Sequence, residues 1–389
     1  MSTKISHAAD LTGLSRLTVS AVHGVANLAE EVHLNIIKQA PDVVAKPLGK
    51  VTSLVYRGVR GVAQLAGSGV TGALTRLQPL LGENSAWPGR EALLAAVNGV
   101  LGDYLARTNN PLAIPMRFRR DGAPLQPAAG ASGRILVLVH GLCMNDLQWH
   151  RADHDHGAVL EREHGYTAVY LHYNSGRHIS ENGREFADQL ETLLAQWPVP
   201  VEELVLLGHS MGGLVSRSAC YHGAEAGHRW LRHLSKMVFL GSPHHGAPLE
   251  RSGNWVHIIT DMSRYTAPFS RLARLRSAGI TDLRHGSLLD EDWADHDRFE
   301  HGHALPQMVV LPAGVACYTV AASISKEKGG LRGRLAGDGL VPVESALGQH
   351  AHEQRRLGFA PERQAVVYRT NHMELLNSQT VYQILAKWL

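Results

Sequence analysis

The sequence predicts an α/β protein in which a mostly parallel central sheet is flanked by helices. Short apolar runs without polar alternation, such as Ile135–Val139 and Leu204–Leu207, are typical of strands that are covered on both faces. Segments with helical periodicity separate these runs along the chain, which indicates repeated strand and helix units. The second run ends in a small, polar turn, at the place where such sheets bind their ligands.

Residues 1–110 are predicted to form a region of amphipathic helices, because apolar residues recur there three and four positions apart. Prolines such as Pro41, Pro47 and Pro79 separate the helices. Two interpretations remain open at this stage. The helices pack on the following domain or on one another, or they lie on a lipid surface. The first apolar stripe comprises Leu14, Leu17, Ala21, Val25, Leu28, Val32 and Ile36.

Residues 111–389 are predicted to form the α/β domain, which begins with the strand and turn of "MRFRRDGAPL". An insertion at residues 250–312 interrupts the pattern and is predicted to be a lid or cap, since it retains Trp255, Tyr265 and Phe269. The expected strands are Ile135–Val139, Thr167–His172, Leu204–Leu207, Lys236–Leu240, Ala316–Ala321 and Ala365–Tyr368, and the expected helices include Ala158–His164, Arg184–Gln196 and, in the insertion, Pro268–Leu275.

Charge and cysteine usage narrow the class of protein. A net charge of +3 over 389 residues, with no basic run interleaved with aromatic residues, argues against nucleic acid as a partner. Three cysteines cannot make a disulfide framework, which favours a reducing compartment. No signal peptide or membrane-spanning run is recognised, so the expected location is cytoplasmic, with peripheral membrane contact possible through the N-terminal helices. The sequence does not determine the oligomeric state.

The turn after Leu204–Leu207 reads Gly208-His209-Ser210-Met211-Gly212, a G-x-S-x-G pattern. Its glycines allow a sharp strand-to-helix elbow that exposes a serine hydroxyl above the sheet. Ser210 is therefore the candidate nucleophile. The alternative is a purely structural serine that caps the following helix.

A serine nucleophile needs a base and an acid that orients the base, and on this kind of sheet they follow the serine in the order acid, then His. Asp338 lies in the glycine-flanked turn of "AGDGLVPVESA", and His372 lies between the last strand and the last helix. Asp338 could instead cap its own turn, in which case Asp261 or Glu250 would have to serve.

Two backbone amides are the candidate oxyanion donors. Leu142 follows the strand that ends in His140-Gly141, and Met211 directly follows Ser210 at the start of its helix. His140 and His209 are expected to line or support the pocket. The patterns "ADHDHG" (152–157) and "DRFEHGH" (297–303) have ligand-like spacing, but a solvated polar loop is favoured over a metal site for both.

Five motifs in this order resemble the α/β-hydrolase lipases, and are most similar to bacterial triacylglycerol lipases and inositol-deacylase-like hydrolases. Along the chain they are His140-Gly141, the serine elbow, "LGSPHHGAPL", "DGLVPVESA" and "NHMELLN". The resemblance implies the α/β-hydrolase fold, with Ser210 as nucleophile, Asp338 as acid and His372 as base. Lipases of this kind often hold a structural calcium. Glu374 matches one of its ligands, but no clear acidic partner lies upstream of Asp338, so calcium is doubtful here.

The predicted function is that of a serine lipase or esterase that hydrolyses esters of hydrophobic acyl chains through an acyl-enzyme and without a cofactor. The expected partner is a lipid or another hydrophobic ester. Two alternatives remain open: an acyltransferase that uses the same triad, and a non-catalytic lipid-binding homologue.

Overall fold

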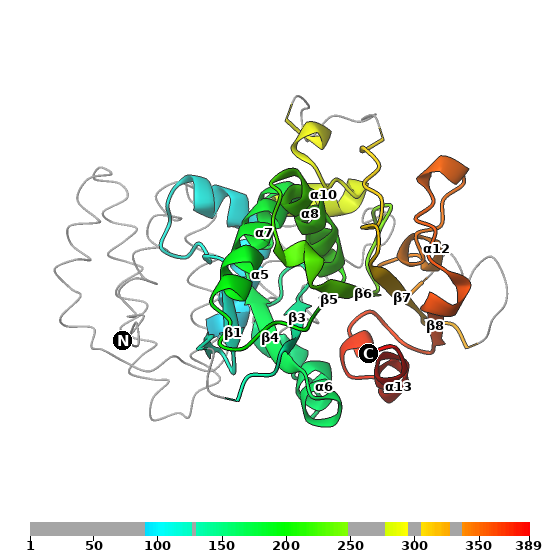
Figure 1. Ribbon diagram of the computed structural model, residues 1–389. Helices are drawn as coiled ribbons and strands as arrows, with labels where there is room; N and C mark the ends of the chain where they lie inside the picture. The colour runs from blue at the N-terminus through cyan, green and yellow to red at the C-terminus, as the bar shows by residue number, and fades with distance from the viewer. Residues whose placement is uncertain (1–89, 127–129, 248–276, 295–304, 327–336) are drawn as a thin grey trace, which may run out of the picture.

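The computed structural model describes residues 90–126, 130–247, 277–294, 305–326 and 337–389. Its centre is an eight-stranded sheet with the order β2-β1-β4-β3-β5-β6-β7-β8 (Figure 1). Strand β1 pairs in antiparallel fashion with β2 and β4, and the remaining pairs are parallel. The strands are β1 (Arg117–Arg120), β2 (Ala123–Pro124), β3 (Arg134–Val139), β4 (Thr167–His172), β5 (Glu203–His209), β6 (Leu234–Leu240), β7 (Ala316–Ser323) and β8 (Gln364–Tyr368).

The unalternated apolar strands are buried on both faces, as the sequence predicts. Along β3, the side chains of Ile135 and Val137 enter one apolar core, whereas Leu136 and Leu138 enter a second core on the opposite face. A parallel strand in this position therefore needs apolar residues at every position rather than at alternate ones. The predicted mostly parallel sheet flanked by helices is confirmed.

Helices cover both faces of the sheet (Figure 1). On one face lie α5 (Arg90–Arg107), α7 (Ile179–Ala195) and α8 (Met211–Glu225), whose buried residues belong to the first core. On the other face lie α6 (His156–His164) and α13 (Gln379–Trp388), whose buried residues belong to the second core. Two shorter helices, α10 (Ala278–His285) and α12 (Val343–Ala346), follow β6 and β7 along the chain.

Helix α7 begins at Ile179, five residues before the predicted start at Arg184. The Ile179 amide donates to the buried carboxylate of Asp282 in α10, over a distance of 2.8 Å. A carboxylate at a helix N-terminus satisfies an otherwise unpaired amide and interacts favourably with the helix dipole. The cap is supplied by a residue about a hundred positions away, so local sequence does not reveal it.

Two predicted segments fall largely outside the described residues. Of the N-terminal region, residues 1–89 lie outside, and only the stretch that contains α5 is described. Of the predicted lid, residues 250–276 and 295–304 lie outside, together with the predicted helix Pro268–Leu275. Within the ranges that are described, no helix has the length and apolarity needed to cross a bilayer.

Candidate active site

Ser210 occupies a strained turn between β5 and α8. Its backbone dihedrals are φ 54° and ψ −124°, a combination that is unfavourable for a residue with a Cβ. The turn is compact because both flanking glycines touch backbone. A Cβ added at Gly208 would lie 2.6 Å from Gly213 Cα, and one added at Gly212 would lie 2.1 Å from the Val139 oxygen. Glycine is therefore required on both sides of Ser210 for the elbow to close.

Asp338 and His372 form a buried, directly hydrogen-bonded pair. His372 Nδ1 lies 2.7 Å from Asp338 Oδ2, and both side chains are nearly inaccessible to solvent. The second carboxylate oxygen accepts from the backbone amides of Leu340 at 2.9 Å and Val341 at 2.8 Å. Both carboxylate oxygens thus accept hydrogen bonds, and Nδ1–H of His372 donates to one of them. This tautomer leaves His372 Nε2 with a free lone pair.

The serine turn and the Asp-His pair lie at the same edge of the sheet. Gly241, directly after β6, has φ 59°, and a Cβ added there would lie 3.2 Å from both Asp338 Oδ2 and His372 Cε1. His209 Nε2 donates to the His372 carbonyl at 3.1 Å, and the two rings are 4.7 Å apart. Asp338 and His372 are therefore in contact, and Ser210 is the immediate neighbour of a residue that contacts His372.

The loop after β3 passes next to the nucleophile. A Cβ added at Gly141 would lie 3.1 Å from Ser210 Cβ, so Leu142 follows at the position expected of an oxyanion donor. Leu142 is buried. Met211 is the first residue of α8, where backbone N–H groups have no partner within the helix. Met211 is thus the direct neighbour of Ser210 in the chain, and Leu142 is the direct neighbour of Gly141, which approaches the serine.

Other elements hold this loop in place. Cys143 has φ 58°, and its amide donates to the Ser175 hydroxyl at 3.0 Å. The Tyr173 hydroxyl donates to the His140 carbonyl at 2.8 Å. From the other side, α5 presses Gly99 against the loop, because a Cβ added at Gly99 would lie 2.2 Å from Cys143 Sγ. Sequence reasoning missed these supports. Tyr173 and Ser175 could have been noticed by their position directly after the predicted strand Thr167–His172.

Two buried histidines next to the site are neutral. Burial lowers the pKa of His140 to about 3 and holds the pKa of His209 well below its ordinary value. His140 stacks on Tyr173 at 4.3 Å, and His209 supports His372 through the hydrogen bond described above. Both side chains support the site rather than carry charge into it.

No group of three or more His, Cys, Asp or Glu side chains that could hold a metal is present among the described residues. Glu374, the position that matches a calcium ligand, accepts from the Asn371 amide at 2.7 Å. For "ADHDHG" (152–157), the prediction of a solvated polar loop is wrong at the C-terminal end of the motif. His156 is fully buried, and its Nε2 donates to the Leu375 carbonyl at 2.9 Å. All of "DRFEHGH" (297–303) lies outside the described residues.

A mostly parallel sheet whose central strand leads through a serine elbow into a helix is the arrangement of the α/β-hydrolase fold, so the predicted fold is confirmed. Residues 130–313, just under half of the chain, match the family model of the PGAP1-like alpha/beta domain. No curated protein matches the chain.

Solved structures with a similar fold include lipases and esterases. A lipase of Bacillus licheniformis in its mature form is 17% identical with a TM-score of 0.43, over 70% of this chain and 97% of that one. An esterase of Thermogutta terrifontis is 14% identical with a TM-score of 0.38, over 71% and 93%. Lipase B of Aspergillus fumigatus is 12% identical with a TM-score of 0.40, over 69% and 53%.

Proposed function

We propose that this protein is a carboxylic ester hydrolase of the lipase or esterase type, with Ser210 as nucleophile. The observation that carries the proposal is the strained serine elbow at the sheet edge that also holds the buried Asp338–His372 pair. The α/β-hydrolase fold and the family match over residues 130–313 support it. A strained serine turn at the same sheet edge as an imidazole oriented by a carboxylate is typical of nucleophilic catalysis.

In the first half-reaction, His372 Nε2 accepts the Ser210 proton as the hydroxyl oxygen attacks the ester carbonyl. The Asp338 carboxylate holds the ring in the productive tautomer and stabilises the imidazolium that forms. The Leu142 and Met211 amides donate to the oxyanion of the tetrahedral intermediate. His372 then returns the proton to the leaving alkoxide, and the acyl group remains on Ser210.

In the second half-reaction, His372 accepts a proton from water, which attacks the acyl-enzyme carbonyl. The same two amides stabilise the second oxyanion. Collapse of this intermediate releases the carboxylic acid, and the proton on His372 returns to Ser210. Every proton transfer passes through one imidazole nitrogen, and no cofactor takes part. The proposed substrates are esters of hydrophobic acyl chains, in keeping with the lipase-like motifs around the site.

The test is hydrolysis of p-nitrophenyl esters from acetate to palmitate by the full chain and by Ser210→Ala. We expect Ser210→Ala to lower kcat by about 10⁴-fold or more, because the acyl-enzyme can no longer form. Ser216→Ala is the matched control. It removes a buried serine hydroxyl from the same helix, one that bonds only the Gly212 carbonyl at 2.8 Å.

Equal activity of wild type and Ser210→Ala would refute the nucleophile. If Ser216→Ala loses as much activity as Ser210→Ala, the loss reflects damage to α8 rather than missing chemistry. The acyl length that gives the highest kcat/KM separates an esterase from a lipase.

A further inference from the structure

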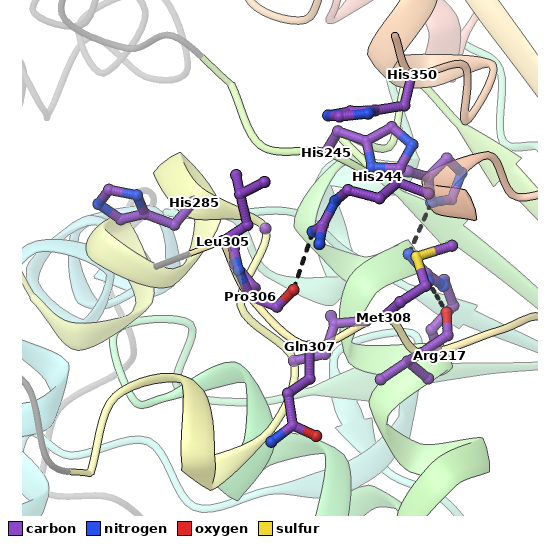
Figure 2. A pocket seen from close by; sticks show the side chains of 13 residues that line it. Arg217, His244, His245, His285, Leu305, Pro306, Gln307, Met308 and His350 are labelled. Carbon is purple, nitrogen blue, oxygen red and sulfur yellow. Dashed lines mark hydrogen bonds between the residues drawn. The ribbon is translucent and has the colours of Figure 1, made fainter. Parts of the chain in front are cut away.

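A pocket rich in basic side chains lies beside α8 (Figure 2), and neither Asp338 nor His372 lines it. Its cavity volume is about 40 Å³. Three parts of the chain form its polar walls: α8 through Arg217, the loop after β6 through His244 and His245, and the segment that carries His350 and Arg355. Residues 305–309 close another side.

Arg217 is a buried cation with an unsatisfied donor. Its side chain is 2% exposed, and burial lowers its pKa only to about 10, so it stays charged at neutral pH. Its terminal nitrogens contact the Val309 carbonyl and, at 3.4 Å, His244 Nδ1. Its Nε is buried without a partner, and no carboxylate within the described ranges pairs with this guanidinium. A buried, unpaired guanidinium with an unsatisfied N–H is stabilised by an anionic hydrogen-bond acceptor.

Unsatisfied nitrogens of His244, His245 and Arg355 belong to the same pocket. His244 Nδ1 faces a guanidinium, which can only donate, so Nδ1 accepts and the ring proton sits on Nε2. That Nε2 is buried and has no partner. Arg355 donates from one terminal nitrogen to the Pro306 carbonyl at 2.9 Å, and its Nε is also buried and unpaired. In Figure 2, His244 and His245 lie above Arg217, with His350 next to His245.

We propose that this pocket binds a phosphate group, held by Arg217, His244 and Arg355. The residues that line it include two guanidinium groups and no Asp or Glu among those described, and this positive charge favours an anion over a metal cation. Guanidinium N–H groups bind phosphate and carboxylate oxygens through paired donors. Two cationic charges match the doubly charged phosphate better than a singly charged carboxylate.

Helix α8 connects the pocket to the candidate active site. Arg217 follows Ser210 by two helical turns, about 10 Å along the axis and on the same face of α8. The Cα–Cβ bond of a helical residue tilts toward the helix N-terminus, which for Arg217 is the serine end of α8. The bound phosphate therefore has two possible sources: a free phosphate ion, or the head group of an ester substrate. The second source rests on the proposed function, and the first does not.

The binding test is calorimetric titration of the full chain with inorganic phosphate near pH 7. We expect saturable binding by the wild type, weakened at least ten-fold in Arg355→Gln and in Arg217→Lys, since the lysine keeps the charge but loses the Nε–H and the planar fork. Arg162→Gln is the matched control, because Arg162 lies on α6 with its side chain 67% exposed. Thermal unfolding of each variant checks that it is folded. Absence of phosphate binding, or equal binding by Arg355→Gln and wild type, would overturn the proposal.

Steady-state kinetics of the wild type then identify the source. If the phosphate belongs to the substrate, inorganic phosphate inhibits hydrolysis of oleoyl lysophosphatidate competitively and leaves hydrolysis of p-nitrophenyl butyrate unchanged. If the ligand is the free ion, phosphate binds without competing with either ester. Calorimetry measures phosphate binding without any turnover, whereas ester hydrolysis tests the proposed function. The two experiments therefore distinguish a failure of the phosphate site from a failure of the hydrolase proposal.

Discussion

Ser210 has a backbone conformation that costs about 1–3 kcal/mol for a residue with a side chain. The surrounding contacts enforce this conformation. The Ser210 amide donates to the Leu240 carbonyl at 2.8 Å, and Gly208 and Gly212 permit the close backbone approach. The sequence predicted the strand-to-helix turn at Ser210, because the need for glycine at both positions leaves a local pattern. The contact between His209 and His372 joins residues 163 positions apart and leaves no such pattern.

At the residue scale, we predict that Asp338→Asn lowers kcat by about 10⁴-fold and leaves the fold intact. The asparagine oxygen can still accept from the Leu340 and Val341 amides, but its amide group then faces His372 Nδ1. A donor in that place favours the tautomer with the proton on Nε2, which cannot accept the serine proton. The kcat for a p-nitrophenyl ester measures the loss of activity, and the circular dichroism spectrum checks that the fold is intact. If Asp338→Asn retains its activity, Asp338 is not the residue that orients His372, and Glu250 or Asp261 becomes the candidate.

At the element scale, α5 is part of the site's support. Its glycines allow close contact with two loops, since a Cβ added at Gly102 would lie 1.8 Å from Asn174 Oδ1. The Gly99 carbonyl accepts from the Ser277 hydroxyl at 2.6 Å, which ties α5 to the start of α10. The periodicity of residues 1–110 predicted helices there. It could not predict which surface this helix covers, because periodicity identifies an apolar face and not its partner.

We predict that Gly99→Ala lowers both stability, by about 1–3 kcal/mol, and kcat/KM, by roughly ten-fold. The added methyl would overlap Cys143 and displace the loop that carries the Leu142 amide. Urea unfolding and ester kinetics give the two values.

Gly133→Ala is the control for this prediction. Its Cβ would lie 2.6 Å from the Pro200 carbonyl, at the start of β3 and thus at the opposite edge of the sheet. We expect it to lower stability without changing kcat/KM. If the two variants have the same kcat/KM, α5 does not position the oxyanion loop.

Across the whole molecule, buried neutral histidines make stability depend on pH. Burial lowers the pKa of His140 to about 3 and that of His156 to about 4, both from 6.5. Between these values and 6.5 the unfolded chain binds more protons than the folded chain, so the free energy of unfolding rises with pH. The stabilisation is fully present above pH 6.5 and is lost as the pH falls toward the folded values.

We predict that each of these two histidines destabilises the protein by about 2 kcal/mol at pH 5 relative to pH 7.5. In His156→Gln, the difference in unfolding free energy between the two pH values should shrink by that amount, because glutamine does not titrate. Urea unfolding at both pH values measures it, with His150→Gln, at an exposed side chain, as the control. An unchanged difference in His156→Gln would contradict the prediction.

The sequence by itself determined the order of strands and helices, the elbow at Ser210 and the candidate partners Asp338 and His372. Each leaves a local trace, such as an unalternated apolar run, a pair of glycines or a polar residue at a strand end. Only the tertiary structure decided the support of the oxyanion loop by α5 and the pocket around Arg217. These features arise where segments distant in the sequence meet. Arg217 lies within an ordinary helical pattern, and its burial and unpaired Nε depend on residues 92 positions away.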